Sequence, residues 1–241
     1  DTSDMLMFNA DEAGIVVKFE KKDTPQKVNI KLFRQGPKDI RLNDTKISQK
    51  ELIGTLNTVI FCPEDLQLIK GTPSGRRRFL DMEISQTSAT YYHQLMQYNR
   101  LLQQRNAILK EYRGKQNIPL EEWDLQLADM ASFIVKKRLE SLKKINLLID
   151  LMNRKLTGGL ENLTIGYEQP YMENGSLEYT KEGFYEHIKA ALPQDRHRLT
   201  TSVGPHRDDL RFFSDAMDLK KFGSQGQQRT AVLSLKLSEL E

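Results

Sequence analysis

Apolar and polar residues alternate with a period of two from about residue 13 to residue 61, the pattern of β-strands with one buried face. The alternation divides into segments at residues 14–22, 28–34, 39–47 and 56–61. A turn is expected at Asn43 and Asp44, and Pro25, Gly36 and Pro37 interrupt the pattern elsewhere. We therefore expect an antiparallel sheet with too few hairpins to form a core alone.

The apolar spacing then changes to alternating steps of three and four, which is typical of amphipathic helices. One stretch runs from Tyr91 to Tyr112 and includes Arg105, and a second runs from Trp123 to Leu156. Residues 114–119 favour a turn between them, and Gly158-Gly159 ends the pattern. We expect an antiparallel helical hairpin whose apolar stripes face each other as core.

Shorter elements follow the hairpin. The pattern predicts a strand at 162–168, a helix at 181–192 ended by Pro193, and strands at 199–203 and 209–214. Antiparallel strands together with a long helical hairpin indicate an α+β fold class.

Composition limits the classes of protein that need to be considered. The 241 residues carry a net charge of only +3, so any nucleic-acid surface must be a local patch. A single cysteine, Cys62, excludes an internal disulfide framework and fits a reducing compartment. No apolar run approaches the roughly 20 residues that cross a bilayer, and no signal peptide is evident, so we expect a soluble, cytoplasmic protein.

The chain ends with a polar, glycine-containing loop that leads into an amphipathic helix, GSQGQQRT at residues 223–230. The N–H groups at a helix start are unpaired and lie at the positive end of the helix dipole, so such a loop favours phosphate. The pattern predicts an anion site with side-chain donors at Ser224, Gln225, Gln227 and Gln228.

Two other segments concentrate charge. Residues 204–210, GPHRDDL, bring together His206, Arg207, Asp208 and Asp209, which is consistent either with a polar site or with a charged hairpin loop. Residues 63–81, PEDLQLIKGTPSGRRRFLD, place an acidic turn before a Gly-x-Pro break and three consecutive arginines.

In their order along the chain, 63–81, 204–210 and 223–230, these three segments resemble the RecF family of bacterial recombination-repair proteins, and the similarity covers nearly the whole chain. The resemblance implies an ATPase head of the ABC type, related to Rad50 and SMC proteins, with a short helical hairpin in place of their long coiled coil. It also implies binding of ATP with Mg²⁺, an ATP-dependent homodimer, slow hydrolysis, DNA binding (single-stranded or gapped duplex), and action with RecR and RecO to load RecA. No membrane partner is implied.

The resemblance assigns a role to the C-terminal loop. It would be the signature loop, in which Ser224, Gly226 and Gln227 stand for the Ser, second Gly and Gln of LSGGQ, and Gln225 replaces the first Gly. The loop, residues 224–228, would contact the γ-phosphate of ATP held by the other protomer and would couple nucleotide binding to dimerisation.

Glu64 and Asp65 occupy the place where related heads carry a loop that touches Mg²⁺. They can serve the metal through a water, or they can favour a helix N-terminus through its dipole. The basic residues available for DNA are Arg76, Arg77 and Arg78, Arg196 and Arg198, and Lys136, Lys137, Arg138, Lys143 and Lys144. Alternatively, residues 76–78 pair with Asp81 and Glu83, and the lysines form a solvated helix face.

Neither a G-x-x-x-x-G-K-[ST] loop nor a strand ending in paired carboxylates occurs in the sequence. The chain starts without methionine and stops within a helical pattern, so we expect a fragment whose Walker A motif precedes Asp1 and whose Walker B motif follows Glu241. Such a fragment should be inactive alone and hold no nucleotide tightly. The expected division is 1–62 as the β part of the ATPase lobe, 63–198 as the helical lobe, and 199–241 as the return to the ATPase lobe.

A second function class stays open. The chain can instead be a helical-hairpin module that displays surfaces for a partner or for self-association, or the head of a different Rad50/SMC-like ATPase.

Overall fold

The computed structural model describes the chain except for residues 1, 22, 57, 115–118, 172–178 and 240–241. The chain divides into two compact units, Asp1–Asn57 and Thr58–Glu241. Each unit has its own arrangement of elements and is described by itself.

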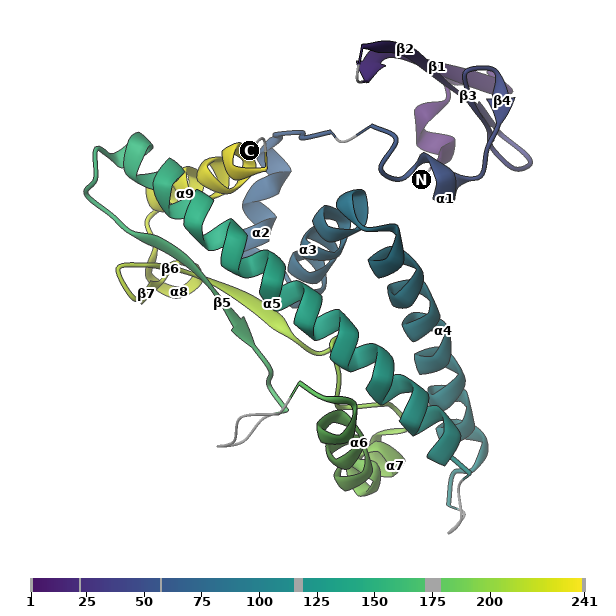
Figure 1. Ribbon diagram of the computed structural model, residues 1–241, viewed down its shortest axis with the longest axis vertical. Coiled ribbons are helices and arrows are strands. Elements are labelled where there is room, and N and C mark those ends of the chain that lie inside the picture. Colours follow the sequence, from purple (N-terminus) through teal and green to yellow (C-terminus); the bar gives the residue numbers. More distant parts are fainter. Residues whose placement is uncertain (1, 22, 57, 115–118, 172–178, 240–241) are drawn as a thin grey trace. The chain divides into compact units, whose positions relative to one another are not determined.

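The first unit is built on a four-stranded antiparallel sheet in the order β1-β2-β3-β4 (Figure 1). The strands are β1 (Glu12–Lys21), β2 (Thr24–Phe33), β3 (Asp39–Leu42) and β4 (Thr45–Lys46), with a 3₁₀ helix at Thr2–Met5 and α1 at Gln49–Leu52. Asn43 and Asp44 have φ of 49° and 68°, which confirms the predicted turn. Val28, Leu32 and Ile40 are the buried side chains of the sheet.

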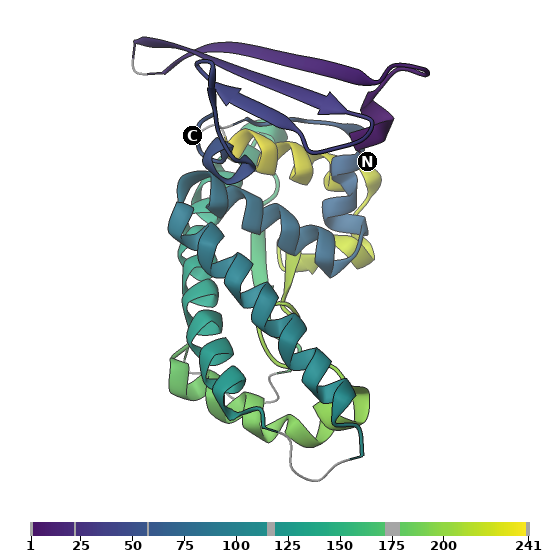
Figure 2. The ribbon, with the colours of Figure 1, turned by 90° about the vertical axis from the view of Figure 1, so that its right-hand side faces the viewer.

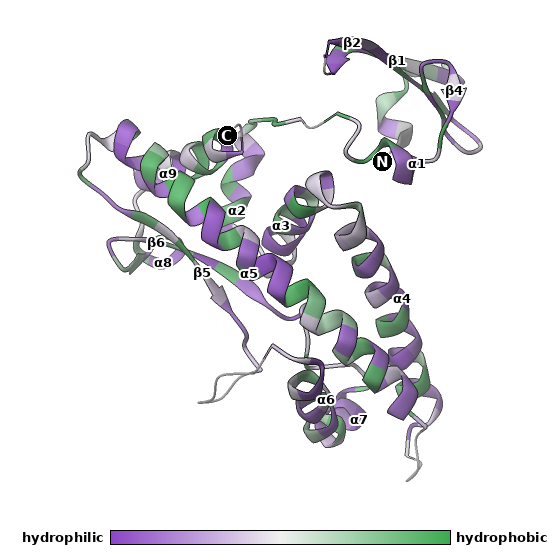
Figure 3. Cartoon of the chain, in the orientation of Figure 1, coloured by the Kyte–Doolittle hydropathy of each residue, from purple (hydrophilic) through white to green (hydrophobic). Residues whose placement is uncertain are grey.

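The second unit contains the predicted helical hairpin, α4 (Ala89–Glu111) and α5 (Glu121–Thr157), whose helices lie side by side in two perpendicular views (Figures 1 and 2). Ser88 caps α4 by accepting a hydrogen bond from the Tyr91 N–H at 3.2 Å, and Gly158 ends α5 in the left-handed conformation. Apolar and polar positions alternate around both helices (Figure 3). Tyr91, Tyr98 and Ile134 are among the buried residues between them.

The remaining elements complete the second unit. They comprise the helices η2 (Pro63–Leu66), α2 (Gln67–Lys70), α3 (Pro73–Thr87), α6 (Lys181–Ala190), α7 (Leu192–Arg198), α8 (Leu219–Phe222) and α9 (Gln225–Ser238). A second antiparallel sheet has the order β5-β6-β7, formed by Leu163–Glu168, Asp209–Ser214 and Met217–Asp218. One hydrophobic core joins residues from these helices and strands.

Two predicted strands and one helix end are wrong. Residues 58–62 form no strand, and the Thr58 N–H donates to the Gln86 side chain at 3.2 Å. Residues 199–203 also form no strand, because the N–H of Thr201 donates to the Asn106 side chain at 2.8 Å. Pro193 lies in the first turn of α7, where a proline is tolerated.

The combination of antiparallel sheets with a long helical hairpin confirms the α+β fold class. The assignment of residues 1–62 and 199–241 to an ATPase lobe, and of 63–198 to a helical lobe, stays a prediction.

Candidate functional site

The predicted anion loop connects α8 to α9. Both ends of α8 are fixed, the first by a cap and the second by a tight turn. The Asp218 carboxylate caps α8 by accepting hydrogen bonds from the Lys220 N–H at 2.8 Å and the Lys221 N–H at 3.3 Å. Gly223 ends α8 so tightly that a Cβ there would lie 2.6 Å from the Leu219 carbonyl oxygen. Glycine is therefore needed for the chain to turn directly from α8 into the loop.

Ser224 and Gln227 form a capping box at the start of α9. The Ser224 Oγ accepts from the Gln227 N–H at 3.2 Å, and the Gln227 Oε1 accepts from the Ser224 N–H at 2.9 Å. Ser224, Gln225 and Gly226 are exposed, and a Cβ on Gly226 would meet only Ser224 Oγ, at 3.8 Å. The backbone at the helix start is thus open to an approaching group.

The side chains of Gln227 and Gln228 contact the body of the protein, whereas Gln225 is exposed. Gln228 is 5% exposed, and its Nε2 donates to the Leu219 carbonyl at 2.7 Å. The Nε2 of Gln227 donates to Glu161 Oε1 at 3.0 Å. These side chains hold the loop against the body of the protein. Among the described residues, the N–H groups of Gln225 and Gly226 find no acceptor, as expected at a helix start.

Residues 204–210 form part of a buried network and not an exposed hairpin loop. His206 Nδ1 lies 2.6 Å from the Tyr98 hydroxyl, and its Nε2 lies 3.0 Å from the Thr201 carbonyl. Asp208 is fully buried and accepts a short hydrogen bond from the Tyr167 hydroxyl. Arg207 is the exposed member, although its guanidinium donates to the Thr201 carbonyl at 2.8 Å.

Burial shifts the titration of both buried groups. Desolvation raises the pKa of Asp208 to about 6, although Arg138 acts in the opposite direction. Desolvation lowers the pKa of His206 to about 4, although its hydrogen bond with Thr201 opposes the shift. At neutral pH the network therefore holds a neutral imidazole beside a carboxylate.

Arg138 joins this network to the helical hairpin. Its side chain is 2% exposed and forms a two-pronged ion pair with Asp81, at 2.9 and 3.0 Å. It also donates to the Pro205 carbonyl at 2.7 Å. The interpretation of Arg138 as part of an exposed basic cluster is wrong, and Asp81 pairs with Arg138 and not with residues 76–78.

Arg105 anchors the opposite end of the hairpin. Its buried guanidinium lies 2.6 Å from Asp124 on α5 and 2.6 Å from Asp195 on α7, and it contacts Thr201. The sequence placed Arg105 in the apolar stripe but gave no sign of its partners, because both carboxylates are far away along the chain.

The three consecutive arginines have different environments. Arg76 is 3% exposed and forms a two-pronged ion pair with Asp209, at 2.7 and 2.9 Å. Arg77 donates to the Asp208 carbonyl at 2.7 Å, whereas Arg78 is exposed. Because Arg76 is buried and paired with Asp209, its guanidinium is not available to DNA phosphates. Lys143 and Lys144 are exposed on α5.

Glu64 and Asp65 also differ. Asp65 Oδ2 accepts from the Cys62 N–H at 2.8 Å, which is a cap at the start of η2, whereas Glu64 is exposed. Within the part of the chain that the structure describes, no three His, Cys, Asp or Glu residues gather as a metal site would require.

No family model matches the chain. It is 43% identical over 241 residues to the DNA replication and repair protein RecF of Alkaliphilus oremlandii, and 43% identical over 239 residues to that of Clostridium botulinum (strain Eklund 17B / Type B). In each case 99% of this chain is covered. The chain belongs to the RecF family.

Solved structures agree with this assignment. A RecF structure described as recombination mediator protein RecF-ATP in the RecFOR pathway superimposes with a TM-score of 0.91 at 32% identity and covers 100% of this chain. A second, described as RecF-ATPrS, gives a TM-score of 0.89 at 32% identity. The descriptions of these two RecF structures thus name ATP and ATPrS.

The chain spans 66% and 65% of the length of these two curated RecF relatives. It also spans 65% and 66% of the two solved RecF chains. Among the helices that the structure describes, none has a long enough apolar stretch to span a bilayer.

Proposed function

We propose that this RecF-family chain belongs to a DNA replication and repair ATPase and supplies the signature half of an ATP site shared between two protomers. The observation that carries the proposal is the exposed start of α9. There, Ser224 and Gly226 are presented by a capped, glycine-bounded loop.

The chemistry of the loop suits a phosphate group. The Ser224 Oγ uses a lone pair to accept from Gln227, so its own O–H is available to donate. The N–H groups of Gln225 and Gly226 add two donors at the positive end of the α9 dipole. Gln227 and Gln228 act indirectly, because their amides hold the loop in place.

The loop carries only part of a nucleotide site. The sequence has no G-x-x-x-x-G-K-[ST] motif, so the phosphates of ATP would be held mainly by another segment or protomer. Asp65 is engaged as a cap, which leaves Glu64 as the carboxylate able to reach Mg²⁺ through a water. The phosphates of ATP would supply the negative charge that the exposed donors of the loop bind.

This division of the site makes ATP a switch for dimerisation. If the loop contacts phosphate only across a dimer interface, ATP binds the dimer more tightly than the monomer and shifts the equilibrium toward the dimer. In the same proposal, the dimer binds single-stranded or gapped DNA and acts with RecO and RecR to load RecA. The exposed Arg78, Lys143 and Lys144 are candidates for contacts with DNA phosphates.

The full-length protein provides the test. Sedimentation velocity and DNA-binding titrations should show that ATP increases both the dimer fraction and the DNA affinity. RecA assembly on gapped DNA should then require ATP, RecO and RecR together. A protein that binds DNA with the same affinity with and without ATP, and stays monomeric in both, would contradict the proposal.

A second candidate function is a docking module built on the hairpin. Leu147 and Leu151 lie one turn apart on α5 and are 76% and 47% exposed, which is unusual for large apolar residues. A pulldown with RecR that depends on these leucines, and survives without ATP, would favour this candidate.

A further inference from the structure

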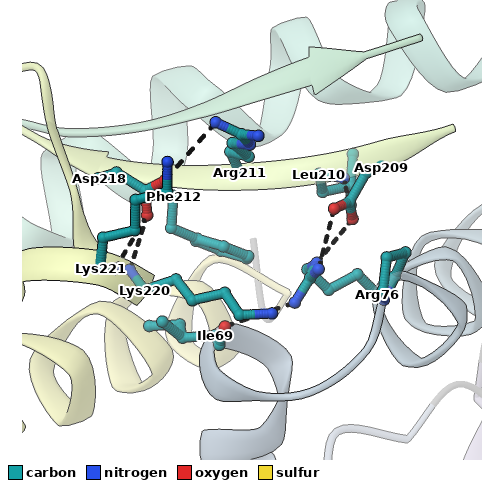
Figure 4. Close-up of a pocket in the computed structure, with 10 residues that line it drawn as sticks. Ile69, Arg76, Asp209, Leu210, Arg211, Phe212, Asp218, Lys220 and Lys221 are labelled. Atoms are coloured by element: carbon teal, nitrogen blue, oxygen red, sulfur yellow. Dashed lines mark hydrogen bonds and ion pairs between the residues drawn. The ribbon is translucent and has the colours of Figure 1, made fainter. Parts of the chain in front are cut away.

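A cation-lined pocket lies beside the loop, between α8, strand β6 and the turn from α2 to α3 (Figure 4). Its volume is about 210 Å³. Arg76, Arg211, Lys220 and Lys221 line it, together with only two carboxylates, Asp209 and Asp218. Ile69, Leu210 and Phe212 form a buried apolar wall.

Both carboxylates are already used by the protein. The two oxygens of Asp209 accept from Arg76, at 2.7 and 2.9 Å (Figure 4). Asp218 Oδ1 caps α8, and its Oδ2 lies 3.7 Å from Arg211 Nη1. Arg211 is further paired with Glu168 at 2.7 Å. These contacts neutralise the two arginines and leave neither carboxylate for a lysine.

The lysines therefore carry the uncompensated charge. Lys220 Nζ donates to the Gly71 carbonyl at 2.8 Å, and Arg76 Nη1 donates to the same oxygen at 3.0 Å, so two cations meet on one neutral acceptor. Lys221 is exposed, as is Lys70, the residue before Gly71. Among the described residues, none of these three lysines forms an ion pair with a carboxylate.

The backbone holds this arrangement in place. Gly71 ends α2 with its N–H 2.8 Å from the Gln67 carbonyl, and a Cβ there would lie 2.4 Å from that oxygen. A side chain at Gly71 would therefore displace the carbonyl shared by Lys220 and Arg76. The pocket is a preformed cluster of cations, which favours a multiply charged anion.

We propose that this pocket binds a phosphate of the DNA backbone, with Lys220 and Lys221 as the direct ligands. Lysine contacts phosphate as a point charge without reading bases, which suits binding that does not depend on sequence. The inference rests on the proposed DNA binding and gives it a location. Lys220 and Lys221 lie within four residues of Ser224, so DNA and ATP would act on the two ends of one short segment.

The test compares charge-matched variants of the full-length protein. Lys220→Gln with Lys221→Gln should reduce the slope of log affinity against log salt for DNA by about two. Lys181→Gln with Lys189→Gln removes the same charge from α6 and should leave the slope unchanged. The Lys221 side chain makes no hydrogen bond to another described residue, so Lys221→Gln alone should reduce the slope by about one. Lys220→Arg with Lys221→Arg keeps both charges and should keep the wild-type slope.

The other outcomes have distinct meanings. If the wild-type protein binds DNA and the glutamine pair keeps the wild-type slope, the pocket is not a DNA contact although the proposed function stands. If the pair weakens ATP binding while its DNA slope is unchanged, the phosphate belongs to the nucleotide and the inference is overturned. A wild-type protein that binds no DNA would overturn both.

Discussion

Ser224 and Gln227 each hydrogen-bond to the other's backbone at the start of α9, at 3.2 and 2.9 Å. This reciprocal pair fixes the loop before any ligand arrives, so the donors at Ser224, Gln225 and Gly226 are already in position. A preorganised loop loses little conformational entropy on binding phosphate. In this geometry the side chain of Gln227, which is matched to the glutamine of LSGGQ, binds the Ser224 N–H and Glu161 and thereby holds the loop against the protein.

The Arg138 network predicts a large loss of stability on substitution. Arg138→Met leaves the partly buried Asp81 and the buried Asp208 without their cation, and breaking such a buried pair costs roughly 3–5 kcal/mol of unfolding free energy. Lys137→Met removes only an exposed pair with Glu140, which is worth below about 1 kcal/mol. Urea unfolding of the two variants measures the difference. Equal losses would show that Arg138 is not a structural centre.

The raised pKa of Asp208 predicts a pH-dependent effect of Asp208→Asn. Folded Asp208 titrates at about 6, whereas the unfolded group titrates near 3.9, so the folded state holds more protons between these values. The stability from this group is complete below about pH 4 and is lost as the pH rises through 6. Between pH 4 and pH 7, the difference in unfolding free energy between Asp208→Asn and the wild type should therefore move by roughly 2 kcal/mol in favour of the variant.

His206 acts in the opposite direction over the same range. Its folded pKa of about 4 lies below its usual value, so the unfolded state holds more protons and stability rises with pH. In the wild type, the pH dependences of the unfolding free energy from Asp208 and His206 offset each other. The Asp208 variant should therefore show the pH dependence that comes from His206, and the His206 variant should show the one that comes from Asp208. Thermal unfolding of Asp208→Asn and His206→Gln between pH 4 and pH 7 makes this comparison. Parallel curves for both variants and the wild type would contradict the buried network.

Substitutions of Arg76 and Arg78 should change different properties, the first the stability of the fold and the second the affinity for DNA. Arg76→Gln breaks the buried pair with Asp209 and should lower the unfolding free energy by roughly 3 kcal/mol. Arg78→Gln, on the exposed side of α3, should leave stability within about 0.5 kcal/mol and reduce the DNA salt slope by about one. The reverse pattern, with Arg78 structural and Arg76 altering only the slope, would contradict the assignment.

Asp65 is expected to act as a cap. Asp65→Ala should lower the unfolding free energy by about 1 kcal/mol, because the Cys62 N–H loses its acceptor, and should leave the Mg²⁺ dependence of ATP hydrolysis unchanged in the full-length protein. Glu64→Gln tests the metal role separately, since Glu64 is exposed. A raised Mg²⁺ requirement in Asp65→Ala would assign Asp65 to the metal instead.

The sequence predicted the elements with strong periodicity and missed the contacts between distant residues. The hairpin and the turn at Asn43-Asp44 were legible because helix period and turn chemistry are local properties. Residues 58–61 of the first predicted strand and residues 199–203 of the second form no strand, because alternation does not reveal whether a partner strand exists. Side chains of Gln86 and Asn106 accept from the Thr58 and Thr201 N–H groups instead.

The site shows the same limit. The loop at residues 224–228 was found because capping residues and glycines mark a helix start locally. Arg138 was placed among exposed cations, because its charge is visible in the sequence whereas its partner Asp81, on another helix, is not. The pocket at Lys220 and Lys221 was missed because its walls come from three separate segments.

The central claim, that Ser224 contacts ATP across a dimer, is tested most directly by sedimentation velocity of full-length Ser224→Arg with and without ATP. The arginine lies at the exposed start of α9 and does not enter the core. Loss of the Ser224 cap costs only about 1 kcal/mol, so the variant should still fold and its monomer should bind ATP with wild-type affinity. We predict that ATP converts the wild-type protein to a dimer and leaves Ser224→Arg monomeric. A variant that dimerises with ATP as the wild type does would contradict the claim.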